Sequence, residues 1–417
     1  MSEKLNEQDR VVVIGSGHAG VELCAALRQR GYAGQIDILG EDPAQPYQRP
    51  PLSKDYMKRP DAPQALRSEQ FYRDNNVGLR TGVRVSAIRR EDRKVELDGG
   101  EQLSYDHLVI ATGARNIRPP IPGLDTPHLL ELRTLQDAAR MAAMLPRLNR
   151  LAVIGAGFVG LEAAGFFADL GRMVEVVDLA PRVMQRAVSP ETSAWFEGFH
   201  RANGVRLHLS DSVARIETEG EAVRLHLASG GQIEADAVLL AAGVAANDDL
   251  ARAAGLNVAD GVLVDSFLRT SDPAISAIGD CARFPPAGGG AATVRLESVQ
   301  NAADQARCLA GRLTGDESPY AALPWFWSVQ GSARLQIAGL ALPPAAGQAP
   351  LTAVLRGDGA GGKLSAFVYD GDRLVAVETV NQAGDHMLAR KLLGLGRPVA
   401  KEQAADSGFD LKTLATA

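Results

Sequence analysis

The chain has 417 residues, a length that predicts two or three domains. Hydrophobic residues make up 46% and charged residues 23%, as in ordinary globular proteins, and the net charge of −6 excludes a general attraction to nucleic acid. No apolar run approaches the ~20 residues of a membrane helix, and the charged start of the chain does not resemble a signal peptide. Because only three cysteines occur, we expect no disulfide framework and a cytoplasmic location.

A strand, a glycine-rich turn and a helix are predicted near the start of the chain. The β-branched run at 11–14 leads into three glycines with the spacing GxGxxG, namely Gly15, Gly17 and Gly20. In a dinucleotide-binding unit the first glycine permits the turn, the second admits a pyrophosphate, and the third lets helix and strand pack closely. An acid about 20 residues downstream binds a ribose diol, and Glu41 follows the second apolar run of this unit.

The segment after this unit is predicted to form a loop and then strands. A proline-rich, basic stretch from Pro46 to Lys54 leads into a short helix at Ser53, because serine is a good helix N-cap. Apolar and polar residues alternate over 79–110 around a Gly-Gly hairpin signal, and a buried strand ends at Gly113.

The same pattern returns in the second half of the chain. Each part has a counterpart: apolar runs at 151–154 and 174–177, the glycines Gly155, Gly157 and Gly160, the acid Asp178, and a strand-rich segment that ends at Gly243. One such loop is weak evidence of nucleotide binding, but two complete units favour two dinucleotide sites. An enzyme with two such sites is expected to move electrons between two bound dinucleotides.

The last part of the chain carries no glycine loop. A strand places Asp280 at its end, and a helix is predicted from about Glu297 to Leu313. Beyond Pro324 apolar strands dominate, and a final helix is predicted to end at Gly394. The seven histidines are scattered without ligand spacing, so no metal site is expected.

Together these motifs resemble a known family. The set comprises both glycine loops, each with a glutamate two residues on, and the segments Arg49-Pro-Pro-Leu-Ser-Lys54, Ala111-Thr-Gly113, Gly279-Asp280 and Pro324-Trp-Phe-Trp-Ser328. They are similar to those of the FAD-dependent NADH:ferredoxin reductases of bacterial oxygenase systems. The resemblance spans nearly the whole chain.

The resemblance implies an α/β fold of glutathione-reductase type, with two Rossmann-like domains and a C-terminal α+β domain. By this resemblance residues 1–115 and 244–323 bind FAD, residues 116–243 bind NADH, and residues 324–417 form the C-terminal domain. It also implies a set of FAD ligands: Gly15, Gly17, Ala19, Gly20, Glu41, Arg49, Val85, Arg133, Asp280 and Val299. Val299 lies in the first turn of a predicted helix, whose dipole favours a negatively charged reduced flavin.

Three further residues are expected to act in catalysis. In the family a lysine and a glutamate meet beside the flavin ring, and Lys54 and Glu162 match them. A cation there stabilises added negative charge. Trp327 is expected to shield the flavin ring or to assist electron exit. The residues alone leave two alternatives open. Lys54 and Glu162 would be unrelated surface charges, and Trp327 would belong to the core.

The second unit is expected to bind NADH. The residues assigned to it are Gly155, Gly157, Phe158, Val159, Gly160, Asp178 and Gly243, with Glu297 near the nicotinamide. Asp178 favours NADH because an acid there repels the 2′-phosphate of NADPH. Arg182 and Arg186 lie nearby in the sequence and leave NADPH possible.

The acceptor is expected to be a [2Fe–2S] ferredoxin that supplies a terminal oxygenase or P450 in aromatic hydrocarbon catabolism. Disulfide reductases of this fold carry a Cys-x4-Cys pair near the flavin, whereas no cysteine occurs between Cys24 and Cys281. Arg307, Arg312 and the Arg390-Lys391 pair are candidates to steer an acidic ferredoxin. Alternatives are another acceptor, such as rubredoxin or a quinone, or an NADH-sensing interaction protein. We expect a monomer or a weak homodimer.

Overall fold

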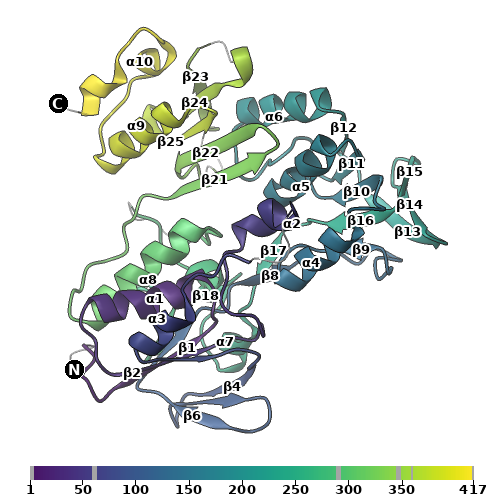
Figure 1. Ribbon diagram of the computed structural model, residues 1–417. Helices are drawn as coiled ribbons and strands as arrows, with labels where there is room; N and C mark the ends of the chain where they lie inside the picture. The colour runs from purple at the N-terminus through teal and green to yellow at the C-terminus, as the bar shows by residue number, and fades with distance from the viewer. Residues whose placement is uncertain (1–3, 59–62, 288–292, 344–348, 358–359, 416–417) are drawn as a thin grey trace. The chain divides into compact units, whose positions relative to one another are not determined.

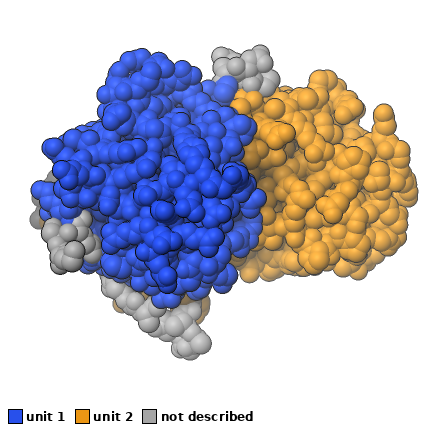
Figure 2. All heavy atoms as spheres, turned by 90° about the horizontal axis from the view of Figure 1, so that it is seen from below, with its two compact units in different colours: residues 1–49, 62–115, 244–322 blue, residues 50–61, 116–243, 323–417 orange. Residues whose placement is uncertain are grey.

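The structure is a computed structural model, drawn in Figure 1, that describes residues 4–58, 63–287, 293–343, 349–357 and 360–415. The chain divides into two compact units, which Figure 2 colours separately. Unit 1 comprises residues 1–49, 62–115 and 244–322, and unit 2 comprises residues 50–61, 116–243 and 323–417. Two short strands, β8 (Ala114–Asn116) and β17 (Val244–Ala246), stand where the chain passes between the units.

Unit 1 is built on a parallel sheet of five strands. They lie in the order β19 (Ile275–Ala277), β7 (His107–Ile110), β1 (Arg10–Ile14), β2 (Gln35–Leu39) and β3 (Val77–Arg80). Val11, Val12 and Val13 of the central strand are fully buried, as expected for a parallel sheet that is covered on both faces.

Helices and a small second sheet complete unit 1. Helix α1 (His18–Gln29) follows the glycine loop and packs along α8 (Val299–Leu313). Shorter helices are α3 (Glu69–Asp74), α7 (Asp249–Ala253) and the 3-10 turn η2 (Gly279–Cys281). The antiparallel sheet contains β4 (Val85–Arg89), β5 (Lys94–Leu97) and β6 (Gln102–Ser104), with the predicted hairpin between β5 and β6. Strands β18 (Val262–Leu263) and β20 (Ala282–Arg283) form a separate pair.

Unit 2 repeats this design in its first sheet. Its strands lie in the order β12 (Val205–Leu209), β11 (Met173–Asp178), β10 (Arg150–Ile154), β16 (Ala237–Leu240) and β9 (Leu129–Leu130), all parallel. A meander of β13 (Val213–Glu219), β14 (Ala222–Leu227) and β15 (Gln232–Ala235) corresponds to β4, β5 and β6. The predicted internal repeat, and with it the α/β class with two Rossmann-like sheets, is confirmed.

The helices of this part of unit 2 are α4 (Leu135–Met144), α5 (Phe158–Asp169) and α6 (Pro190–Ala202). The turn η1 (Pro50–Ser53) and helix α2 (Asp55–Lys58) also belong to unit 2. The predicted short helix therefore begins two residues after Ser53, which ends η1.

The C-terminal part of unit 2 is an antiparallel sheet with helices. Its strands lie in the order β21 (Trp325–Gln330), β22 (Ala333–Gly339), β25 (Arg373–Val380), β24 (Leu364–Asp370) and β23 (Thr352–Leu355). Helix α9 (Ala383–Gly394) packs on β22 and β25, and α10 (Lys401–Ala405) and the 3-10 turns η3 (Ala360–Gly362) and η4 (Leu411–Ala415) complete it (Figure 1). The predicted final helix and the α+β class of this part are confirmed.

Buried polar contacts join this sheet to the α6 region of the same unit. Glu378 on β25 accepts hydrogen bonds from the backbone N–H of Ser189 (2.9 Å) and from its hydroxyl (2.7 Å). Ser189 is the N-cap of α6. Burial raises the pKa of Glu378, and these donors oppose that rise.

Gly165 of α5 determines how closely β21 approaches. A Cβ at this position would lie 2.8 Å from the backbone nitrogen of Gly331. We expect Gly165→Ala to lower the free energy of unfolding by about 1–3 kcal/mol, because backbone must shift to admit the methyl group. Urea denaturation checks this, with Gly198→Ala on α6 as the control, since a Cβ there meets nothing within 4 Å. Equal stability of the two variants would contradict the close packing of α5 and β21.

Candidate functional site

The three glycines of the first loop have different structural roles. Gly15 has φ +116°, and a Cβ there would lie 2.1 Å from the carbonyl oxygen of Ala111. A Cβ at Gly20 would lie 2.1 Å from the carbonyl oxygen of Gly15. A Cβ at Gly17, by contrast, would meet nothing within 4 Å. The fold therefore requires the first and third glycines, whereas the second faces open space.

The second loop repeats these roles. Gly155 has φ +111°, and its Cβ would lie 2.3 Å from the carbonyl oxygen of Ala241. A Cβ at Gly160 would lie 2.1 Å from the carbonyl oxygen of Gly155, whereas one at Gly157 would meet nothing within 4 Å. The fold does not explain a glycine at 17 or 157, but a pyrophosphate that lies against the backbone does.

The helices that follow these loops begin without a side-chain cap. Gly17 and Gly157 are the N-caps of α1 and α5, and neither helix start has a side-chain cap. By comparison, a serine or threonine side chain caps α3, α4, α6 and α8. The first N–H groups of α1 and α5 can therefore bind an anion, supported by the helix dipole. Both loops fit a dinucleotide pyrophosphate.

The two predicted ribose-binding acids are not at equivalent positions. Ile14 pairs with Leu39 and Ile154 pairs with Val177, so Asp178 corresponds to Gly40, and Glu41 corresponds to Leu179. The carboxylate of Asp178 accepts from the backbone N–H of Ala156 (2.5 Å) and of Ala180 (2.7 Å). Glu41 is largely exposed, 3.9 Å from Arg84.

Unit 1 brings several predicted FAD ligands to one region. A Cβ at Gly279 would lie 3.0 Å from the Cβ of Ala19, so the turn that carries Asp280 lies against the start of α1. Gln305 of α8 accepts from the backbone N–H of Gly279 (2.7 Å), and Val299 is the first residue of α8.

Arg295 is a residue that sequence reasoning missed in this region. Its side chain is 9% exposed, and its guanidinium pairs with Glu297 (2.5 Å) and Asp260 (3.2 Å) and donates to the carbonyl of Asp280 (3.3 Å). Glu297 is thus held by an arginine beside Asp280. No local sequence pattern predicts that Arg295 contacts both Glu297 and Asp280, so the sequence could not indicate its place in the site.

The remaining predicted FAD residues are placed as follows. Arg49 is half-buried and follows the isolated bridge at Tyr47, and Val85 begins β4 and is buried, both in unit 1. Arg133 belongs to unit 2, where its backbone N–H donates to Asp137 in the capping box of α4 (3.1 Å).

Lys54 and Glu162 form an ion pair within unit 2. The ammonium of Lys54 lies 2.9 Å from Glu162 Oε2, and the glutamate side chain is 9% exposed. The hydroxyls of Ser53 and Ser328 each donate to this carboxylate at 2.8 Å. The structure thus brings the predicted pair together, and both serines are site residues that sequence reasoning missed.

The aromatic residues of β21 stack beside this pair. Trp325 and Trp327 have ring centroids 5.4 Å apart, and the guanidinium of Arg390 lies 4.5 Å above Trp325. Phe158, predicted to bind NADH, packs on Phe326 with centroids 4.5 Å apart. Phe158 therefore connects the second glycine loop to the strand that carries Trp327.

Of the two arginines that follow Asp178 in the sequence, Arg182 is hydrogen-bonded to backbone carbonyls of its own loop. Arg182 donates to the carbonyls of Val188 (2.8 Å) and Gln185 (2.9 Å). Arg186 lies against Gly243, because a Cβ at Gly243 would be 3.3 Å from Nη2 of this arginine.

Val159, which is predicted to bind NADH, is 43% exposed at the start of α5.

The prediction that Arg312 helps to steer an acidic ferredoxin is wrong, because this side chain is buried. Arg312 is 1% exposed and donates to Ser276, because α8 turns this face into unit 1. Arg307 pairs with Glu22 (2.9 Å) and Asp304 (2.7 Å).

The three cysteines are free thiols. Cys24 and Cys281 are fully buried, and burial raises the pKa of Cys24 to about 12. Among the described residues no cluster of three potential metal ligands occurs, and no helix is long and apolar enough to span a membrane.

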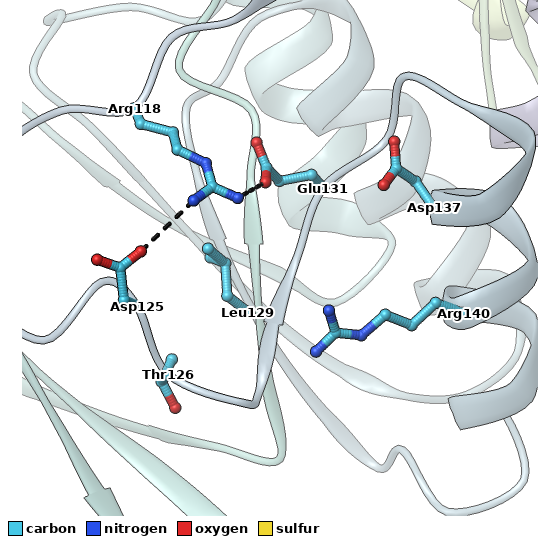
Figure 3. A pocket seen from close by; sticks show the side chains of 7 residues that line it. All are labelled: Arg118, Asp125, Thr126, Leu129, Glu131, Asp137 and Arg140. Atoms are coloured by element: carbon cyan, nitrogen blue, oxygen red, sulfur yellow. Dashed lines mark hydrogen bonds and ion pairs between the residues drawn. The ribbon is translucent and has the colours of Figure 1, made fainter. Parts of the chain in front are cut away.

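A surface pocket of about 200 Å³ lies in unit 2, and its lining residue Asp137 accepts a hydrogen bond from the backbone N–H of Arg133. Figure 3 shows its lining: Arg118, Asp125, Thr126, Leu129, Glu131, Asp137 and Arg140. Within this lining Arg118 forms ion pairs with both Asp125 and Glu131. None of the predicted site residues lines it.

Two parallel sheets, each with a glycine loop that has room for a pyrophosphate, define a protein that binds two dinucleotides. The family described as Pyridine nucleotide-disulphide oxidoreductase matches residues 9–306, and the family described as Reductase C-terminal matches residues 325–415. The chain therefore belongs to the pyridine nucleotide-disulphide oxidoreductases that carry a reductase C-terminal domain, and it is an oxidoreductase.

Within that family the chain is similar to ferredoxin reductases. It is 46% identical over 405 residues to rhodocoxin reductase of Rhodococcus erythropolis, covering 96% of this chain and 93% of the relative. The ferredoxin reductase for the CYP199A2 system from Rhodopseudomonas palustris has a TM-score of 0.92 at 45% identity, covering 98% of this chain and 100% of that structure. The putidaredoxin reductase–putidaredoxin complex has a TM-score of 0.91 at 35% identity, with 99% of each chain covered. The resemblance inferred from the motifs is confirmed.

Proposed function

We propose that this protein transfers hydride from NADH to FAD and then passes single electrons to a [2Fe–2S] ferredoxin that supplies an oxygenase or P450. The observation that carries the proposal is the pair of glycine loops, in which only Gly17 and Gly157 face open space. The Lys54–Glu162 ion pair also supports the proposal, since the glutamate fixes the position of a cation that can stabilise negative charge in the reaction. Two relatives are reductase components of anthranilate and p-cumate dioxygenase systems, which favours a role in aromatic catabolism.

FAD, when bound, accepts two electrons at once and returns them one at a time. In the proposal the protein holds it with the first loop, Ala19, Glu41, Arg49, Val85, Arg133, Asp280 and Val299, and it holds NADH with the second loop, Asp178, Gly243 and Glu297. Lys54 supplies a positive charge where the flavin gains negative charge, and Glu162 fixes the position of that charge. Trp327 covers the flavin or assists electron exit.

The proposed domains are an FAD domain of residues 1–115 and 244–323, an NADH domain of residues 116–243 and a C-terminal domain of residues 324–417. The presence of one glycine loop on each parallel sheet supports this division. We place the protein in the cytoplasm, where thiols stay reduced, and the three free cysteines are consistent with that. We propose a monomer or a weak homodimer.

NADH is the proposed nucleotide because Asp178 repels a 2′-phosphate and Arg182 is bound to its own loop. We expect Asp178→Asn to lower the ratio of kcat/KM for NADH over NADPH by about tenfold, because the repelling charge is lost. Initial rates with each nucleotide measure this ratio. Glu221→Gln, a change at an exposed acid of the same unit, is the control and leaves the ratio unchanged. An unchanged ratio in Asp178→Asn would show that Asp178 does not determine the preference for NADH over NADPH.

The proposed function is tested by anaerobic NADH titration of the purified yellow protein, followed by an acceptor panel. One equivalent of NADH is expected to bleach the flavin. Among a [2Fe–2S] ferredoxin, a rubredoxin and a quinone, the ferredoxin is expected to be reduced fastest. A flavin that NADH does not bleach would overturn the proposal and favour a sensing role.

A further inference from the structure

We propose that Ser328 is a positioning residue for the hydride step, because its hydroxyl holds the Glu162 carboxylate and, through it, the Lys54 ammonium. This inference rests on the proposed function. Ser328 lies in the C-terminal sheet, next to Trp327 on β21, whereas Glu162 lies on α5, two residues after the last glycine of the second loop. One hydroxyl thus connects the C-terminal domain to the charged pair.

The Glu162 carboxylate is held by donors from different elements of unit 2. Oε2 accepts from the ammonium of Lys54 (2.9 Å) and from the hydroxyl of Ser53 (2.8 Å). Oε1 accepts from the hydroxyl of Ser328 (2.8 Å) and from the backbone N–H of Val329 (3.2 Å). The donors to Oε1 both come from β21. Without the Ser328 hydroxyl, Oε1 would keep only the longer of its two hydrogen bonds.

The partners on β21 position the carboxylate without neutralising it. A serine hydroxyl and a backbone N–H carry no net charge, so Lys54 is the single cation that binds Glu162 in the described contacts. Behind Ser328 the buried network continues to Gln330 (3.3 Å), which bonds His200 (2.8 Å). Burial lowers the pKa of His200, which favours the neutral imidazole at this end of the network.

The corresponding residue of the first repeat shows that this arrangement is not a property of the motif. Glu22 stands two residues after Gly20, as Glu162 stands after Gly160. Glu22 pairs with Arg67 (3.0 Å) and Arg307 (2.9 Å), and no serine of the described part of the chain donates to it. Its side chain is 21% exposed, compared with 9% for Glu162. The buried serine donors are therefore specific to the glutamate that binds Lys54.

The matched control is Ser365→Ala. Ser365 is a buried serine on β24 of the same sheet, and its hydroxyl donates to a carboxylate, that of Asp385 (2.6 Å). Ser328→Ala and Ser365→Ala each remove one hydrogen bond that a buried serine of the C-terminal sheet donates to a carboxylate. Only the first of these bonds involves the carboxylate that binds Lys54.

The kinetic test is anaerobic stopped-flow reduction of the flavin by NADH. We expect Ser328→Ala to lower the limiting rate about fivefold, the equivalent of one net hydrogen bond, with the dissociation constant for NADH unchanged. Ser328→Thr restores the hydroxyl and is expected to stay within about twofold of the wild type. Equal rates for Ser328→Ala and Ser365→Ala, in proteins of equal melting temperature, would overturn the inference.

A double-mutant cycle tests whether Ser328 acts through Glu162. In a Glu162→Gln background the further change Ser328→Ala is expected to alter the limiting rate by less than about 1.5-fold. A full fivefold effect in that background would show that Ser328 does not act through the carboxylate, and would contradict the inference.

A second readout does not depend on catalysis. Lys54 is 24% exposed, and its acylation by an amine-reactive ester is measured by peptide mass spectrometry relative to Lys363 and Lys412. We expect about threefold faster acylation of Lys54 in Ser328→Ala than in the wild type, Ser328→Thr or Ser365→Ala, because the ammonium is held less firmly. An unchanged rate would count against Ser328. If NADH fails to bleach the wild-type flavin, the proposed function fails, while this measurement still decides whether Ser328 holds the pair.

Discussion

We expect NADH to reduce the flavin of a Lys54→Met variant about 100-fold more slowly than that of the wild-type protein. Methionine keeps an unbranched apolar stem but removes the ammonium that lies 2.9 Å from Glu162. The lost cation no longer stabilises the negative charge that the flavin gains, and the buried carboxylate loses its counterion. Both effects raise the barrier to hydride transfer.

Anaerobic stopped-flow absorbance measures this rate directly. Lys363→Met, a change at an exposed lysine before β24, is the control and is expected to react like the wild type. A Lys54→Met protein that binds FAD and reacts at the wild-type rate would mean that the ion pair serves stability alone.

The second large effect concerns the middle glycine of each loop. Gly17→Val is expected to yield a colourless protein that has lost FAD, because the new side chain fills the space left for the pyrophosphate. Gly157→Val is expected to keep FAD but to weaken NADH binding by at least about tenfold. Both variants are expected to fold as apoproteins, since a Cβ at either position meets nothing within 4 Å.

The flavin absorbance of the purified variants and titration with NAD⁺ separate the two sites. Gly198→Val, at a glycine of α6 that also faces open space, is the control. Gly15→Val is expected to prevent folding, since its Cβ would lie 2.1 Å from a backbone oxygen. Loss of FAD from Gly157→Val with NAD⁺ binding intact would reverse the assignment of the two loops.

The sequence was sufficient to predict features that depend on local spacing. The glycine loops, the repeated strand order and the final helix follow from turn chemistry and hydrophobic period, and all are present. The Lys54–Glu162 contact joins residues 108 positions apart, and only the resemblance to a family indicated it.

Other features required the three-dimensional structure. Ser328 and Arg295 make hydrogen bonds to residues far away in the sequence, which no local pattern predicts. Glu41 lies one residue further along its unit than Asp178 does, and this difference follows from the strand register. The spacing of residues in the sequence does not determine the register to within one residue. The sequence does not indicate that Arg312 is buried, because helix periodicity does not show which neighbouring element covers a charged residue.

NADH-driven reduction of cytochrome c, with and without an added [2Fe–2S] ferredoxin, tests the central claim most directly. The proposed function predicts slow reduction by the flavoprotein alone and a stimulation of at least about tenfold when the ferredoxin is present. The Lys54→Met variant is expected to lose this stimulated rate. A rate that the ferredoxin does not change, in a protein whose flavin NADH bleaches fully, would contradict the assignment of a ferredoxin as the acceptor.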